Sequence, residues 1–60
     1  MEHLLNTKEL AEYLGLAVST ILQYRVDGNG PIYIKLGHLV RYRKSDVDEW
    51  LKAKTNKEEK

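Results

Sequence analysis

Cations that could contact a phosphate backbone gather in one short stretch of this 60-residue sequence. Between Pro31 and Lys44 there are four bases and no acids, whereas acids outnumber bases four to two from Met1 to Gly30. The four bases are Lys35, Arg41, Arg43 and Lys44. Because clustered Lys and Arg side chains neutralise phosphates, such a local basic segment is typical of nucleic-acid contact. A solvated strand face is the alternative interpretation.

The sequence shows no catalytic or metal-binding motif outside this basic stretch. Cysteine is absent, and the two histidines, His3 and His38, are too far apart to suggest a local metal motif. Three acids, Asp46, Asp48 and Glu49, cluster where a helix should begin, and acids there favour the helix dipole. We therefore expect no catalytic residue, no metal and no cofactor.

Length and hydropathy set further limits. We expect a single domain with no second, catalytic one, because 60 residues support one small core at most. No apolar run approaches the ~18 residues that cross a bilayer, and no export signal is evident. The sequence thus predicts a cytoplasmic protein without membrane association.

Two short helices are expected ahead of the basic stretch. Asn6 can cap the first helix together with Glu9, so that this helix covers residues 7–14. Gly15 suits the left-handed conformation that ends a helix. The second helix should cover Val18–Arg25, with Ser19 and Gln23 pointing outward.

The spacing of three residues predicts how these two helices pack. Ala11 offers a small side chain at a helix crossing, Gly15 allows the turn, and Ile21 seals the contact from the second helix, with Val18 and Tyr24 beside it. This is the helix-turn-helix pattern. Any tightly packed pair of helices could show it, so the pattern alone leaves that alternative open.

A β-hairpin is predicted next, after a loop at residues 27–31. Ile32, Ile34 and Leu36 alternate with Tyr33 and Lys35, and after a turn at Gly37–His38 the alternation resumes through Val40 and Tyr42. We expect the aliphatic and aromatic residues on the inner face. The outer face would carry Lys35, Arg41 and Arg43, placed to straddle phosphates beside a groove.

A third helix completes the predicted fold. Ser45 and Asp48 resemble a capping box, Trp50 should join the core, and the helix should end near Ala53. The fold class is mainly α with a small β-hairpin, a winged helix-turn-helix of order α-α-β-β-α in residues 1–53. Residues 54–60 should form a charged, flexible tail.

Taken together, these stretches resemble the winged helix-turn-helix domain of excisionases and AlpA-like phage regulators, which are relatives of the MerR DNA-binding domain. The resemblance covers about residues 4–52. It is carried by Leu4–Leu16, Tyr24–Arg25, Gly28–Pro31, Ile34–Gly37, Val40–Arg43 and Ser45–Leu51.

The resemblance implies sequence-specific binding of double-stranded DNA, with helix two in the major groove and the wing at the flanking backbone or minor groove. The base-reading positions then fall on Ser19, Thr20, Leu22 and Gln23, where Leu22 can touch a thymine methyl and Gln23 can pair with adenine. The backbone and wing contacts fall on Arg25, Lys35, His38, Arg41, Arg43 and Lys44.

The sequence also departs from its relatives. Ala17 stands where a serine usually caps helix two, and helix two has no arginine before Arg25. The wing tip has His38 and Leu39 at positions where basic residues are common. We therefore expect loose, salt-sensitive binding by one copy and cooperative self-association on adjacent sites.

Three functional alternatives remain open at this point. The DNA-binding protein is either a recombination directionality factor that works with an integrase or a transcription regulator of a phage or mobile element. A protein-interaction adaptor that recruits a larger enzyme is the alternative from another class, and Leu39 at the wing tip favours either this adaptor or a self-association contact. RNA binding has little support, because no outward aromatic pair is evident.

Overall fold

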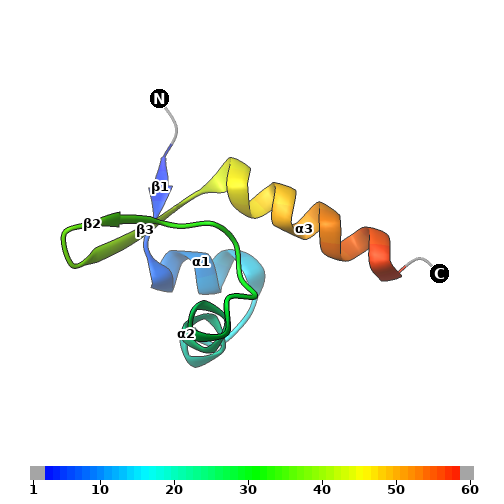
Figure 1. The fold of residues 1–60 in the computed structure, drawn as a ribbon, viewed down its shortest axis with the longest axis horizontal. Coiled ribbons are helices and arrows are strands. Elements are labelled where there is room, and N and C mark those ends of the chain that lie inside the picture. Colours follow the sequence, from blue (N-terminus) through cyan, green and yellow to red (C-terminus); the bar gives the residue numbers. More distant parts are fainter. Residues whose placement is uncertain (1–2, 59–60) are drawn as a thin grey trace.

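The computed structural model describes residues 3–58 (Figure 1). Within that range the chain forms helices and short strands in the order β1 (Leu4–Leu5), α1 (Thr7–Leu14), α2 (Val18–Asp27), β2 (Ile34–Leu36), β3 (Leu39–Arg43) and α3 (Lys44–Glu58). The predicted order α-α-β-β-α and the winged helix-turn-helix class are confirmed, with β1 added ahead of them.

Helix α1 begins and ends as its sequence predicts. The Glu9 backbone amide donates to Asn6 Oδ1 at 2.7 Å, and the Asn6 amide donates to Glu9 Oε1 at 2.9 Å. Gly15 ends the helix with φ at 71°, a conformation that costs glycine little because it has no Cβ. The chain therefore leaves α1 through a sharp turn towards α2.

Helix α2 begins at Val18 as predicted but ends later than predicted. It continues to Asp27 instead of ending at Arg25, because Gly28, at φ 75°, supplies the left-handed cap two residues later. Its N-cap, Ala17, makes no side-chain hydrogen bond. Val18, expected beside Ile21, is exposed.

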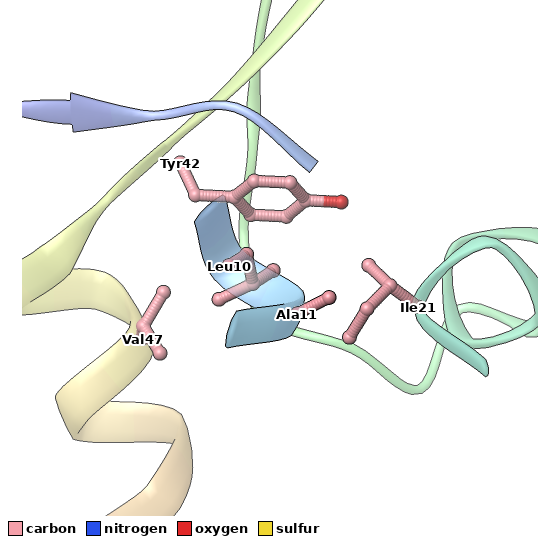
Figure 2. Packing of buried hydrophobic residues seen from close by; sticks show 5 residues of the cluster. All are labelled: Leu10, Ala11, Ile21, Tyr42 and Val47. Atoms are coloured by element: carbon pink, nitrogen blue, oxygen red, sulfur yellow. The ribbon is translucent and has the colours of Figure 1, made fainter. Parts of the chain in front are cut away.

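The core is small and lies where α1 meets the other elements. Figure 2 shows Leu10 and Ala11 of α1 between Val47 of α3 and Ile21 of α2, with the Tyr42 ring above them. All five side chains are buried. The predicted crossing of Ala11 and Ile21 is confirmed, and it holds α2 against α1.

Strand β1 was not expected from the sequence. It pairs antiparallel with β3, placing Leu4 opposite Arg43 and Leu5 opposite Tyr42. The sheet order is β1-β3-β2, so β3 is the central strand. Because Leu5 packs against the core cluster beside Tyr42, β1 closes one side of the core.

The hairpin forms at the predicted turn, but the predicted faces of β2 are wrong. Its register pairs Ile34 with Arg41, Lys35 with Val40 and Leu36 with Leu39. Directly paired residues of antiparallel strands share a face.

Lys35 therefore lies on the inner face, with Val40 and Tyr42, whereas Ile34 and Leu36 lie on the outer face with Arg41. The reason is the two-residue turn Gly37–His38 between β2 and β3, which pairs the residues on either side of it. Ile32, expected inside, precedes the strand and is 70% exposed. When the alternation along a strand is shifted by one residue, every side chain of the strand moves to the opposite face of the sheet.

Helix α3 starts at Lys44, one residue before the predicted start, and extends to Glu58 instead of ending near Ala53. Part of the predicted tail is therefore helical, and residues 59–60 lie outside the described residues. Val47 is buried, and Trp50 is half-buried with its ring 5.8 Å from that of Tyr24, edge to face. The first half of α3 thus packs on the domain, and the second half extends away from it (Figure 1).

Candidate nucleic-acid interface

The outer surface of α2 carries the residues that the sequence assigned to base reading. Ser19, Leu22 and Gln23 are exposed, and Thr20 is half-buried. The Gln23 amide nitrogen donates to Asp27 Oδ1 at 3.1 Å, one helical turn away. This contact orients the Gln23 amide along the helix and leaves its carbonyl oxygen as an acceptor.

An apolar stripe runs along the same face of α2, and only its middle residue, Leu22, was expected there from the sequence. Val18, Leu22 and Val26 follow one another at intervals of four residues and are exposed, Val26 to 80%. Residues at this spacing share a helix face. The spacing was present in the sequence, but Val18 had been assigned to the core. The exposed face of α2 can therefore offer both hydrogen bonds and methyl contacts.

The hairpin carries cations on both of its faces. Arg41 and Arg43 alternate with Tyr42 along β3 and lie on the outer face, whereas Lys35 lies on the inner face, on the side of Tyr42. Arg41 is half-buried, and its Nη1 donates to the Val40 carbonyl oxygen at 2.8 Å. His38 is exposed at the turn. A DNA backbone on either side of the hairpin would thus meet a positively charged side chain.

Two of the wing cations are already paired with acids of α3. Arg43 Nε lies 3.2 Å from Asp46 Oδ2, and Lys44 Nζ lies 3.5 Å from Asp48 Oδ2. All four side chains keep solvent exposure, so the pairs are weak and can exchange for a phosphate. These two acids of α3 consequently lower the positive potential that the wing presents to a phosphate.

Tyr13 extends the second pair into a network between α1 and α3. Its hydroxyl donates to Asp48 Oδ1 at 2.6 Å, and Lys44 Nζ lies 5.1 Å from the centre of its ring. The hydrogen bond from Tyr13, helped by the charge of Lys44, lowers the pKa of Asp48. The Tyr13 hydroxyl and then the Asp48 carboxylate raise the pKa of Lys44. These shifts favour the charged forms of both residues.

Arg25 is held by other residues of the domain. Its Nη1 donates to the Tyr42 hydroxyl at 3.0 Å and to Thr7 Oγ1 at 3.4 Å. Its guanidinium lies 5.8 Å from the centre of the Tyr33 ring. The side chain expected at the DNA backbone thus connects α2 to α1 and β3.

Two further observations concern the described residues as a whole. Residues 3–58 contain no group of three or more His, Cys, Asp and Glu side chains that could hold a metal ion. None of the helices in this range is long and apolar enough to cross a membrane.

The comparison with known protein families agrees with this geometry. Residues 4–55 match the family described as Helix-turn-helix domain. No curated protein sequence matches the chain. The family match spans both helices, the hairpin and most of α3. The protein therefore belongs to the helix-turn-helix domain family, and this membership indicates DNA binding.

Proposed function

We propose that this protein is an excisionase-like DNA-binding protein that recognises a specific sequence with α2 and holds the flanking backbone or minor groove with its hairpin wing. The observation that carries the proposal is the exposed face of α2 beside an acid-free hairpin, on a domain of the helix-turn-helix family. The protein has no catalytic role in this proposal and acts in the cytoplasm.

Base recognition is assigned to Ser19, Thr20, Leu22 and Gln23 of α2. Gln23 can pair with an adenine through its amide, and Leu22, which is 41% exposed, can contact a thymine methyl. Few side chains on this face can make two hydrogen bonds to one base. Sequence preference should therefore depend strongly on Gln23.

Backbone contacts are assigned to the wing and its flanks. Arg41 and Arg43 would meet phosphates on the outer side of the hairpin and Lys35 on the inner side, with His38 at the turn and Lys44 at the start of α3. Because these few cations displace few counterions from DNA, a single copy of the protein should bind weakly at physiological salt. Cooperative self-association on repeated sites would then supply the affinity.

The test is an electrophoretic mobility shift of the pure protein on DNA fragments flanking its own gene, at low and near-physiological salt. The variant Arg41→Ala/Arg43→Ala removes two wing cations. Lys52→Ala/Lys54→Ala is the matched control, because it removes the same charge from exposed positions on α3, away from the wing.

Discrete stepwise shifts that resist competitor DNA are expected for the parent and for the control. The wing variant should lose these shifts. The negative slope of log affinity against log salt concentration should become shallower by ~0.9 for each phosphate contact removed. Equal binding by the wing variant and the parent would contradict the wing assignment.

The proposal includes two biological roles, which differ in where the DNA site lies. A recombination directionality factor would bind at an attachment site beside an integrase gene, whereas a regulator would bind at a promoter. Footprinting on both kinds of fragment distinguishes them, and addition of the neighbouring integrase should extend the footprint only in the first case.

A second candidate, an adaptor that recruits a larger enzyme, is favoured by one observation. Leu36 and Leu39 pair across the hairpin on its outer face and are 50% and 46% exposed. Exposed apolar pairs of this kind serve protein contacts. A protein that binds no DNA, and whose Leu39→Ser variant loses an enzyme partner, would be this adaptor.

A further inference from the structure

Arg25 links the recognition helix directly to the central strand of the wing by a side-chain hydrogen bond. It lies in the last turn of α2 and is half-buried. Its Nη1 donates 3.0 Å to the hydroxyl of Tyr42, a residue of β3 that is only 1% exposed. The buried phenol needs a hydrogen-bond partner, and this guanidinium supplies it. Figure 2 shows the Tyr42 ring lying over α1 with its hydroxyl directed towards the side of α2.

The same guanidinium reaches two further parts of the fold. It donates to Thr7 Oγ1 at the start of α1, at 3.4 Å, and it lies over the Tyr33 ring just before β2. The Tyr33 ring is in turn 6.1 Å from the ring of Tyr42. Arg25 thus joins α2, α1, β3 and the residue that precedes β2 through one planar group with several donors.

The rest of the packing gives this link its importance. Among the described residues, α2 packs chiefly on α1, while the hairpin packs on α1 and α3 through β3. The orientation of α2 relative to the wing is therefore set indirectly, through α1 and through the contact of Tyr24 with Trp50 of α3, whereas Arg25 reaches β3 directly.

We infer that Arg25 is a positioning residue that fixes the angle between the recognition helix and the wing, and that it does so through Tyr42 instead of through a phosphate. The inference rests on the proposed function, in which both elements must meet DNA at once. Contacts on two elements add to affinity only when the protein holds both in the required geometry. Arg25 would thus affect DNA binding without touching DNA.

Three variants of the full chain separate positioning from direct contact: Arg25→Gln, Arg25→Lys and Tyr42→Phe. Tyr42→Phe keeps the buried ring and removes only the hydroxyl that accepts from Arg25. Lys52→Gln is the control, because it also removes one positive charge, from a side chain on α3 that is 72% exposed. Circular dichroism melts establish that every variant is folded at the temperature of measurement.

In the mobility shift, we expect all three variants to lose about tenfold in affinity, with the double variant Arg25→Gln/Tyr42→Phe no weaker than either single change. The salt slope should stay at the parent value, because no phosphate contact is lost. A direct phosphate contact gives a different result: Arg25→Lys keeps its affinity, Tyr42→Phe has no effect, and Arg25→Gln lowers the slope by ~0.9. That result would overturn the inference.

A measurement without DNA keeps the inference separate from the proposed function. Residual dipolar couplings of backbone amides report the orientation of α2 relative to β3. We expect Arg25→Gln, Arg25→Lys and Tyr42→Phe to change the relative alignment of these two elements, and Lys52→Gln to leave it unchanged. If the parent binds no DNA, the proposed function fails while the alignment still decides the role of Arg25. Unchanged alignment in all variants would refute that role.

Discussion

Arg43, the last residue of β3, forms an ion pair with Asp46 in the first turn of α3, with Nε and Oδ2 3.2 Å apart. A cation proposed to contact a phosphate is therefore partly neutralised by its own protein. Binding DNA through Arg43 requires this pair to open or to share the guanidinium with a phosphate.

Asp46→Asn should strengthen DNA binding. The change removes one negative charge beside the wing and releases Arg43, so we expect an affinity gain of about two- to tenfold at low salt that shrinks as salt screens the charge. Mobility shifts across a salt series measure it. Glu49→Gln is the charge-matched control, because Glu49 pairs with Lys52 farther along α3. Equal gains from both variants would indicate a general charge effect and no specific role for the pair.

Ala17→Ser should stabilise the domain. Ala17 occupies the N-cap of α2 in an extended conformation, with φ −74° and ψ 151°, that a serine cap adopts without strain. A serine hydroxyl can accept from a free amide of the first turn and should add ~1 kcal/mol to the free energy of unfolding. Urea denaturation followed by circular dichroism tests this. Ala53→Ser, inside α3, should instead lower stability slightly, since serine is a poorer helix former.

Gly30→Ala should destabilise the loop between α2 and β2. A Cβ at Gly30 would lie 3.1 Å from Cβ of Tyr24, which belongs to α2 and cannot rotate away. Replacing glycine by alanine usually stabilises a protein by restricting the unfolded chain, but we expect this contact to reverse the sign and cost ~1 kcal/mol. The same denaturation measurement applies. Greater stability of the variant would mean that the loop shifts to accommodate the methyl group.

Acid should weaken the contact between α1 and α3. The Tyr13 hydrogen bond holds the pKa of Asp48 below its unfolded value of about 3.9, so its contribution to stability is complete above that value. The contribution is lost as the pH falls through the lower pKa of the folded state.

In Tyr13→Phe, the pKa of Asp48 should rise towards its ordinary value, and stability should depend less on pH in this acidic range. Carbon-detected NMR titration of the Asp48 carboxyl measures the pKa in both proteins. An identical Asp48 titration in the two would mean that the Tyr13 hydroxyl does not stabilise the carboxylate.

Local signals in the sequence predicted the helical half of the fold well. Asn6 and Glu9 are near neighbours that cap α1, and Ala11 and Ile21 pack as their spacing predicts. The predicted faces of β2 were wrong because the hydrophobic alternation was followed through the turn. A two-residue loop already requires Leu36 to share a face with Leu39.

Contacts between distant parts of the chain could not be predicted. Strand β1 has only two residues, too few for an alternation signal, and it forms by pairing with β3. The partners of Arg25 lie on α1 and β3, so the sequence around Arg25 contains no sign of them. The base-reading and backbone assignments remain predictions.

Trp50 is positioned to serve as an intrinsic fluorescence probe of the fold. It is the only tryptophan of the sequence, and its indole Nε1 donates to the Asn29 carbonyl oxygen at 2.9 Å while its ring meets Tyr24. Its fluorescence therefore arises where α2, the following loop and α3 meet. Emission and quenching by iodide would report the opening of this junction directly, without any label, during refolding or on addition of DNA.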